Sequence, residues 1–343
     1  MPLAQLAGWL NRQRDRAFEA CPPVAHRVHF GGRNLSISGP ARALDRVNLH
    51  GLWPATERQP EIRLALLSRD DLDTLPDVSG LRRGAYGALL ETDPGGGVRP
   101  ADDLNPWLVC VEQDRSRLLA YDTEKQLAIL WPGSAAPPRE LAEFCRPLFH
   151  WAAIGDHRVV VHAAGIALNG RAVLIAGAGN AGKTTFVRAC LAAGFDYMGD
   201  NVVEVNPGRP QEGLPMAWGA YPTLKVRPGG PVFDNPVLPE PSWDDEARKN
   251  IYFLGGPAGP GFQARPMIHA ATLVLSEKGP PAIEPFSKGE AFFSIAPNTV
   301  AQFPFYHGET LARLRRVSEQ APTFAAGRLR LSRIPDCVKE LLA

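Results

Sequence analysis

One segment of the chain combines residue types and spacing that suit phosphate binding. From Gly177 to Thr184 the sequence reads GAGNAGKT, which fits the pattern G-x-x-x-x-G-K-[ST] at every required position. Glycines let backbone N–H groups turn toward phosphate oxygens, and the N-terminus of a following helix adds positive potential there. In this pattern Lys183 reaches the β- and γ-phosphates, and the hydroxyl of Thr184 is a ligand of Mg²⁺. The segment therefore predicts a site for a nucleoside triphosphate and magnesium.

The expected contacts to the nucleotide cover the whole loop and the first helical turn. They are Gly177, Ala178, Gly179, Asn180, Ala181, Gly182, Lys183, Thr184 and Thr185. The flanking sequence supports this, because an apolar strand, Ala172–Ala176, leads in and a helix, Lys183–Ala193, leads out and stops at Gly194. The plain alternative is a glycine-rich turn without a ligand. Such a turn does not require the complete motif between a strand and a helix, so the complete motif favours the binding loop.

The same glycines also fit a dinucleotide-binding pattern. Gly177, Gly179 and Gly182 match G-x-G-x-x-G, and Asp196 and Asp200 lie near the offset of a ribose-binding acid. A lysine directly after the third glycine has no role in a dinucleotide fold but is required in a phosphate loop. An NAD-binding protein therefore stays as an alternative and is not the preferred interpretation.

A hairpin signal precedes the loop. Asn169-Gly170 suits the two positive φ angles of a type I′ turn. Counting outward from this turn pairs Leu168 with Arg171 and, by continuation, Ala164 with Ile175, Ala163 with Ala176 and His162 with Gly177. His162 would then lie beside the phosphates as a proton acceptor or charge stabiliser, or it would be an inert core histidine. The sequence does not decide between these two roles.

An aspartate follows the next expected strand. After the β-prone run Phe195–Met198 comes Gly199-Asp200-Asn201, followed by a second run, Val202–Val205. In phosphate-loop proteins an aspartate at a neighbouring strand end serves magnesium or the attacking group. Asp200 is the best candidate for both roles, and a turn residue in a G-D-N corner is the alternative. The absence of an N-K-x-D signature favours ATP over GTP.

The pattern of residue types changes along the chain and predicts two domains, 1–134 and 135–343. The first begins with a helix, Leu3–Ala20, and continues with short β-prone runs and polar or Gly/Pro turns, which predicts a small sheet-rich accessory domain. Pro132–Pro138 is the expected linker, and a helix over Arg139–Ala153 opens the second domain. The β-prone runs are Arg27–Phe30, Glu61–Leu67, Trp107–Glu112, Arg117–Tyr121 and Leu127–Leu130.

The second domain is expected to be an α+β domain with a mixed sheet. The strand that feeds the loop follows a hairpin, so its neighbour is antiparallel, whereas the common phosphate-loop ATPase has parallel neighbours. Lys225, Arg227, Arg248 and Lys249 are candidate phosphate clamps or ordinary surface residues. Phe253–Phe262 is either a flap that closes on substrate or a passive loop.

Composition narrows the class of protein. The chain has 343 residues and a net charge of +1, so no overall field draws it toward nucleic acid or a membrane. Five scattered cysteines favour reduced thiols over a disulfide framework or a zinc site. The first residues become charged too early for a signal peptide, and the apolar stretch Val159–Gly179 is interrupted by polar residues. These features predict a cytoplasmic protein and leave a homo-oligomer open.

Several of these segments together resemble a known family. The chain is similar to the catalytic domain of HPr kinase/phosphorylase in four segments. These are Val161-His162, the loop, Ala193-Gly194-Phe195 and the run from Gly199 to Glu204. They are closer still to the HPr-kinase-like serine kinases of bacterial peptide-modification clusters, including lasso-peptide precursor kinases. The resemblance is weaker over Trp218–Pro228 and over Ala321–Leu342, and the N-terminal domain does not share it.

The resemblance implies a fold shared with ATP-dependent phosphoenolpyruvate carboxykinases and a Mg-ATP-dependent serine kinase acting on a protein or peptide. It implies that Lys183 binds phosphates, that Thr184 and Asp200 hold magnesium, and that Asp200 is the base, with His162 alongside. Two departures speak against phosphorylase activity and against HPr as the substrate. The family's Asp-Asp pair is Asp200-Asn201 here, and no later Glu-x-Arg-Gly signature is present. A nucleotide-binding scaffold or switch protein with little or no transferase activity is therefore a second alternative.

Overall fold

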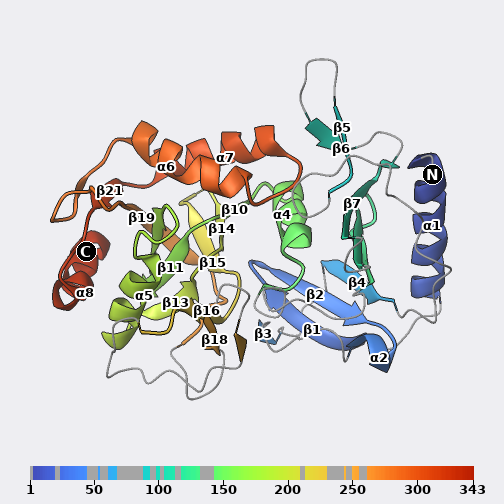
Figure 1. Ribbon diagram of the computed structural model, residues 1–343, viewed down its shortest axis with the longest axis horizontal. Coiled ribbons are helices and arrows are strands. Elements are labelled where there is room, and N and C mark those ends of the chain that lie inside the picture. Colours follow the sequence, from blue (N-terminus) through green and yellow to red (C-terminus); the bar gives the residue numbers. More distant parts are fainter. Residues whose placement is uncertain are drawn as a thin grey trace. The chain divides into compact units, whose positions relative to one another are not determined.

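The computed structural model describes residues 3–19, 24–44, 53–54, 61–67, 88–92, 98–100, 104–112, 117–131, 143–208, 213–229, 243–244, 249–254 and 261–343. They form a mixed α/β protein with several sheets (Figure 1). The chain divides into two compact units. One comprises Met1–His29, Arg33–Gly155 and Phe303–Tyr306; the other comprises Phe30–Gly32, Asp156–Gln302 and His307–Ala343.

The division along the chain falls after Gly155, later than the boundary expected after residue 134. Helix α4 (Arg146–Gly155) is the reason, because its side chains are buried almost all round and pack within the first unit. Trp151 stacks on Tyr121 at 6.4 Å between ring centroids and donates from Nε1 to the carbonyl of Pro304 at 3.2 Å. In the described part of the helix expected over Arg139–Ala153, α4 begins at Arg146, after Cys145 with its φ of +51°, which a helix does not contain. The expected linker, Pro132–Pro138, lies outside the described residues.

A mixed seven-stranded sheet forms the first unit, in the order β3-β1-β2-β4-β9-β8-β7. Strands β2, β4 and β9 are parallel neighbours, and β7, β8 and β9 pair antiparallel. All five β-prone runs expected in this part of the chain are strands. Arg33–Ser38 is a further strand, which the sequence analysis did not predict. The bounds are β1 Val24–Phe30, β2 Arg33–Ser38, β3 Trp53–Pro54, β4 Ile62–Leu66, β7 Trp107–Glu112, β8 Arg117–Asp122 and β9 Leu127–Trp131.

Helix α1 (Leu3–Glu19) covers this sheet with one face. Its buried residues are Leu6, Trp9, Leu10, Gln13 and Arg14, at the i, i+3, i+4, i+7, i+8 spacing of an amphipathic helix. The apolar ones join a core with residues of β4, β7, β8 and β9. A short helix, α2 (Ala41–Leu44), and a two-stranded ribbon, β5 (Leu90–Thr92) with β6 (Val98–Pro100), complete the unit.

The second unit contains a nine-stranded sheet with the central order β10-β14-β15-β19-β12-β11-β13. Strand β12 has an antiparallel neighbour, β11, on one side and a parallel neighbour, β19, on the other, so the expected mixed sheet is confirmed. Strands β20 and β21 extend the sheet beside β19. The bounds are β10 Val159–Val161, β11 Ala164–Leu168, β12 Arg171–Gly177, β13 Asp196–Gly199, β14 Val203–Asn206, β15 Met216–Gly219, β19 Met267–Leu275, β20 Glu284–Pro285 and β21 Thr323–Ala326.

The predicted hairpin between β11 and β12 is confirmed over its strand pairs. Asn169 and Gly170 have φ values of +52° and +78°, as a type I′ turn requires. The observed pairs run from Leu168–Arg171 to Ala164–Ile175, in the predicted register. The two further pairs expected, which would have placed His162 opposite Gly177, do not form. The chain bends at His162 and Ala163, and the preceding strand, β10, pairs with β14.

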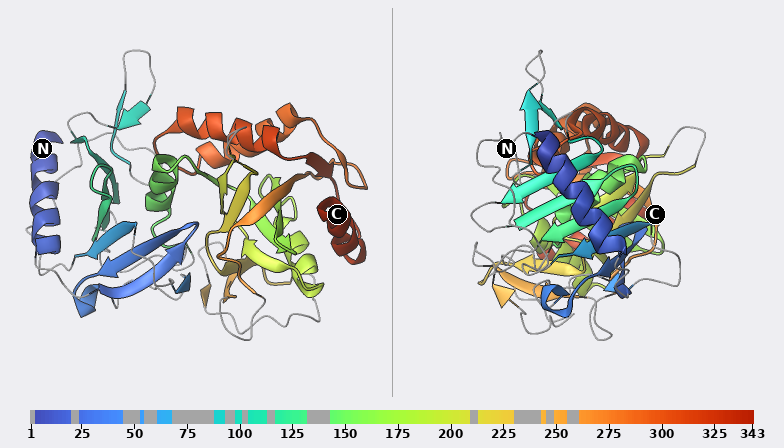
Figure 2. Two further views of the ribbon diagram at one scale, coloured as in Figure 1. Left: turned by 180° about the vertical axis from the view of Figure 1, so that it is seen from behind. Right: turned by 90° about the vertical axis from the view of Figure 1, so that its right-hand side faces the viewer.

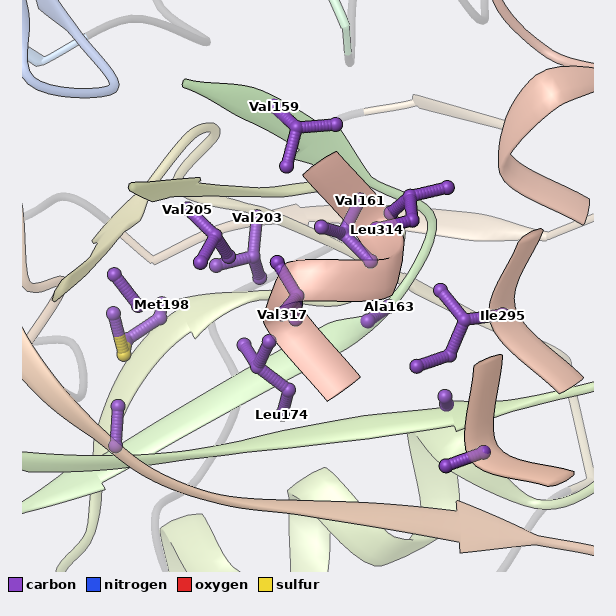
Figure 3. Packing of buried hydrophobic residues seen from close by; sticks show 14 of the residues in the cluster. Val159, Val161, Ala163, Leu174, Met198, Val203, Val205, Ile295, Leu314 and Val317 are labelled. Atoms are coloured by element: carbon purple, nitrogen blue, oxygen red, sulfur yellow. The ribbon is translucent and has the colours of Figure 1, made fainter. Parts of the chain in front are cut away.

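Helices cover both faces of this sheet (Figures 1 and 2). Helices α6 (Lys288–Val300) and α7 (His307–Gln320) close a core over one face. Figure 3 shows Leu314 of α7 beside Val161, and Val317 of α7 between Val203 and Leu174. Helix α5 (Lys183–Ala192), the short 3₁₀ turn η5 (Leu331–Arg333) and α8 (Ile334–Leu342) pack together on the other face.

A small separate sheet adjoins these elements. It has three strands in the order β16-β18-β17, with β16 Thr223–Val226, β17 Trp243–Asp244 and β18 Asn250–Phe253. Among the described residues, no helix combines the length and apolarity that crossing a bilayer requires.

Candidate nucleotide site

The loop from Gly177 to Thr184 joins β12 to α5, as the sequence predicts. Gly177, Asn180 and Gly182 have φ values of +145°, +68° and +98°, so three loop residues adopt a backbone that favours glycine or asparagine. A side chain at Gly177 would place its Cβ 2.5 Å from the carbonyl oxygen of Leu275 on the neighbouring strand. Glycine is therefore required at the start of the loop by both its conformation and its close packing.

Lys183 is folded back over this loop. Its ammonium donates to the carbonyls of Gly177 at 2.8 Å and Ala178 at 3.2 Å, and the residue is only 9% exposed. Burial lowers the pKa of Lys183; the charge of Asp200 opposes this shift and that of Lys249 adds to it. The lysine is thus held at the loop by carbonyl acceptors that phosphate oxygens can replace.

Asp200 and Thr184 meet across the sheet edge. The Thr184 hydroxyl donates to the Asp200 carboxylate, 2.9 Å from Oδ1 and 3.1 Å from Oδ2. Strand β11 lies between β12 and β13 and is antiparallel to both, so β12 and β13 run in the same direction. Their carboxyl ends therefore open on the same edge of the sheet, which is the usual position of ligands in such sheets.

The Asp200 carboxylate is buried, with 9% of the residue exposed. Burial raises the pKa of Asp200, while the Thr184 hydroxyl, Lys249 and the backbone and charge of Lys225 act to lower it. The backbone N–H of Lys225 donates to Oδ2 at 3.4 Å. A carboxylate and a hydroxyl at this spacing fit the oxygen ligands that Mg²⁺ takes in phosphate sites. Among the described residues, no group of three or more His, Cys, Asp or Glu side chains is arranged to hold a metal.

A cavity of about 360 Å³ lies over the loop. It contains most of the predicted site, although Gly177, Ala178 and Ala181 are not part of its wall. The lining residues are His162, Gly179, Asn180, Gly182, Lys183, Thr184, Thr185, Arg188, Asp200, Asn201, Lys225, Val226, Arg227 and Lys249.

Three cations reach the cavity from the small three-stranded sheet. Strands β16 and β18 pair antiparallel, with Val226 opposite Asn250 at one end. Lys225 and Arg227 flank Val226, and Lys249 precedes Asn250, so the pairing gathers three cationic side chains at one place. These are three of the four candidate clamps from the sequence; Arg248 lies outside the described residues, as do residues 255–260 of the candidate flap.

Arg188 also lines the cavity, and the sequence analysis did not select it. It follows Thr184 by four residues on α5, the spacing that places two side chains on one face of a helix. This spacing is the sequence signal from which Arg188 could have been selected as a site residue. Burial lowers the pKa of the Arg188 guanidinium, and the neighbouring Tyr252 of β18 acts in the other direction.

His162 reaches the cavity by a different route from the one expected. The bend between β10 and β11 places it in the cavity wall, and its backbone N–H donates to the Thr299 hydroxyl at 3.1 Å. A half-buried ring beside the loop is compatible with either role considered from the sequence. Asn201, directly after Asp200, lines the same cavity.

Comparison with known proteins finds only a weak similarity to solved structures. No protein-family model matches the chain, and no curated protein matches it. Among solved structures, the HPr(Ser) kinase/phosphatase from Coxiella burnetii is similar, with a TM-score of 0.29 and 14% sequence identity. The match covers 53% of this chain and 93% of that one. These values are too low to place the chain in a family, and the site therefore stands on its own geometry.

Proposed function

We propose that this protein binds ATP and magnesium over the loop from Gly177 to Thr184 and transfers the γ-phosphoryl group to a serine-type hydroxyl of a protein or peptide. The observation that carries the proposal is the hydrogen bond between Thr184 and the buried Asp200 at the mouth of the loop. It joins the expected magnesium ligand of the loop to a carboxylate from a second strand end, the pair that holds magnesium in phosphate-loop NTPases.

Each residue has a role that follows from its position. Lys183 exchanges its bonds to the loop carbonyls for phosphate oxygens, and Thr184 and Asp200 hold the metal. Magnesium, when bound, neutralises charge on the phosphates. Asp200 also orients the acceptor hydroxyl and takes its proton, because its carboxylate lies in the cavity beside the loop where the acceptor would enter. His162 and Lys249 line the same cavity and stabilise the charge that develops.

The reaction balances without a further reactant. The bond from the γ-phosphorus to the bridging oxygen of ATP breaks, and a new bond forms between that phosphorus and the acceptor oxygen. The hydroxyl proton passes to Asp200 and then to solvent, and ADP leaves. The protein contributes positioning and electrostatic stabilisation and forms no covalent intermediate.

A second candidate function is a nucleotide-dependent switch or scaffold. Asn201 favours it, since this side chain lines the cavity where the resembling kinases have a second carboxylate. Such a protein would bind ATP and magnesium but transfer phosphate slowly or not at all. The dinucleotide alternative requires NAD binding that is independent of magnesium, and the position of Lys183 within the loop speaks against it.

The test combines binding with turnover. ATP, GTP and NAD are titrated by calorimetry with and without magnesium, and labelled ATP is then incubated with a serine peptide library. Wild type is compared with Lys183→Ala, Asp200→Asn and the control Arg171→Gln, which changes an exposed arginine at the opposite end of β12. Magnesium-dependent ATP binding with label on serine, abolished in the first two variants only, supports the kinase. Binding without transfer to any acceptor supports the switch, and NAD binding without ATP binding contradicts the phosphate loop.

A further inference from the structure

The turn at His162 is held by two backbone hydrogen bonds. Strand β10 ends at Val161 and β11 begins at Ala164, so two residues carry the chain from one strand to the next. The N–H of Ala163 donates to the carbonyl of Val161 at 2.9 Å, the i to i+2 bond of a γ-turn centred on His162. The N–H of His162 itself donates to the Thr299 hydroxyl at 3.1 Å. Both backbone donors of the turn are therefore satisfied, one of them by a side chain of α6.

Thr299 is the polar position on an otherwise apolar face of α6. The buried residues of this helix are Ala291, Ile295, Ala296 and Thr299, and the first three join the core over the sheet. A fully buried hydroxyl such as that of Thr299 costs free energy unless it is hydrogen-bonded, and a valine has a similar shape without this cost. Packing of α6 therefore does not explain this threonine, whereas its bond to the backbone of His162 does.

The turn and the bond to Thr299 together fix the backbone at His162. His162 lines the cavity with Lys183, Thr184 and Asp200, whereas Thr299 is 0% exposed. The γ-turn fixes the backbone dihedral angles of the residue at its centre, and the bond from its N–H ties that residue to α6. Thr299 thereby determines the point from which the imidazole extends, and a group that assists transfer must be held closely in place relative to the reacting atoms.

We propose that Thr299 is a positioning residue, which holds the γ-turn so that the imidazole of His162 contacts the phosphates of the bound nucleotide. This inference rests on the proposed nucleotide site. It assigns His162 to the reacting groups, a choice that the sequence leaves open. Thr299 is buried and acts only through His162.

The first experiment separates positioning from stability by a double-mutant cycle in phosphoryl transfer. Thr299→Val removes the acceptor of the His162 N–H, and we expect kcat to fall at least about tenfold with little change in the KM for ATP. Thr299→Ser keeps a hydroxyl and should restore most of this loss. In the His162→Gln background, Thr299→Val should have no further effect on kcat, because the group through which it acts is absent. An equal loss in both backgrounds, or no loss in either, overturns the inference and leaves the kinase intact.

A second buried threonine provides the matched control. Thr310 of α7 is 1% exposed, and its hydroxyl has no hydrogen-bond partner within the described part of the chain. Thr310→Val makes the same substitution in a helix over the same face of the sheet and should leave kcat unchanged. A loss of kcat equal to that in Thr299→Val would assign the effect to helix packing and overturn the inference.

NMR of the full chain gives readouts that do not depend on transfer. The ring signals of His162, assigned by their loss in His162→Gln, should shift when magnesium and a non-hydrolysable ATP analogue bind to the wild type. The shift should be smaller in Thr299→Val. Bound analogue without a shift of these signals overturns the inference. A shift that depends on Thr299, without transfer to any acceptor, supports the inference and contradicts the kinase.

Amide exchange tests the anchor without any variant. The N–H of His162 should exchange slowly with solvent in the wild type, because its acceptor is a fully buried hydroxyl. Exchange as fast as that of an exposed loop amide would overturn the inference, even if Thr299→Val did not fold.

Discussion

Each of the two units has a buried aspartate at the end of a strand, and the surroundings of these two aspartates differ. Asp122 is the last residue of β8, and Asp200 follows β13 directly. The Asp122 carboxylate, which is 0% exposed, accepts from the Arg14 guanidinium at 2.8 Å and from the backbone N–H groups of Glu124 and Lys125 at 3.1 and 3.0 Å. Asp200 accepts from a hydroxyl and from one distant backbone N–H.

The difference lies in the donors. A cation at contact distance and two backbone N–H groups compensate the charge of Asp122, which therefore fixes the turn after β8 and ties α1 to the sheet. Asp200 has neutral donors at contact distance, and burial raises its pKa. Burial of a carboxylate alone does not indicate a reactive site; the set of partners does. Asp122 has a cation at contact distance, whereas Lys225 and Lys249 act on Asp200 through charge and one distant backbone N–H.

The largest effect should come from Asp200→Asn. We expect the rate of phosphoryl transfer to fall at least about 10³-fold, since the variant loses the group that we propose as both base and metal ligand. The free energy of unfolding should stay equal or rise, because the folded-state pKa of Asp200 is raised. Its ionised form therefore destabilises the folded chain at neutral pH, and an uncharged amide does not. Labelled-ATP assays and urea unfolding at pH 7 measure the two quantities. A large loss of stability with full activity would show that Asp200, like Asp122, has a structural role.

Asp122→Asn should give the opposite result. Removing this charge leaves the mostly buried Arg14 guanidinium without its principal partner in the sheet, and we expect a loss of about 3 kcal/mol in the free energy of unfolding. The rate of transfer per folded molecule should not change. Urea unfolding followed by tryptophan fluorescence measures the first quantity, and transfer assays on the folded fraction measure the second. A stable variant with impaired transfer would contradict the structural role.

His269 is a third buried titratable group. Unlike the two aspartates, it is charged when it is protonated. It lies on β19 with Nε2 2.9 Å from the Thr272 hydroxyl, and burial lowers its pKa to about 4 from 6.5. Below pH 6.5 the unfolded chain takes up a proton that the folded chain does not, so stability falls as the pH falls toward 4. This residue should account for a loss of about 2 kcal/mol between pH 7 and pH 5.

The control for that prediction is another histidine. His269→Gln should show a smaller loss of stability between pH 7 and pH 5 than wild type, whereas His307→Gln, at an exposed position, should keep the wild-type loss. Urea unfolding at the two pH values gives the comparison. An unchanged pH dependence in His269→Gln would show that burial does not hold the ring neutral.

The smallest effect should come from an exposed carboxylate. Asp336 pairs with Lys339 at 3.4 Å on α8, with 70% and 52% of their side chains exposed. Because solvent screens such a pair, Asp336→Asn should change the free energy of unfolding by less than about 0.5 kcal/mol and leave transfer unaffected. A loss comparable with that of Asp122→Asn would mean that burial is not what separates these aspartates.

Local signals in the sequence were sufficient for much of the fold. The hairpin register followed from Asn169-Gly170 because that turn fixes the pairing of its own strands. The loop between β12 and α5 followed from the glycines and Lys183. Other elements required distant contacts. The bend at His162 arises because β10 pairs with β14 and not with the end of β12, and no local pattern records that pairing.

The sequence by itself therefore determined which groups are offered at this site: a glycine-rich loop with its lysine and threonine, and an aspartate after a strand. Only the tertiary structure decided that Asp200 meets Thr184, because two strands separated by β11 open on one sheet edge. It also decided that Arg188 and the cations of β16 and β18 share one cavity with the loop. Residue type and local backbone preference are written in short stretches of sequence, whereas proximity and burial depend on which distant segments pair and pack.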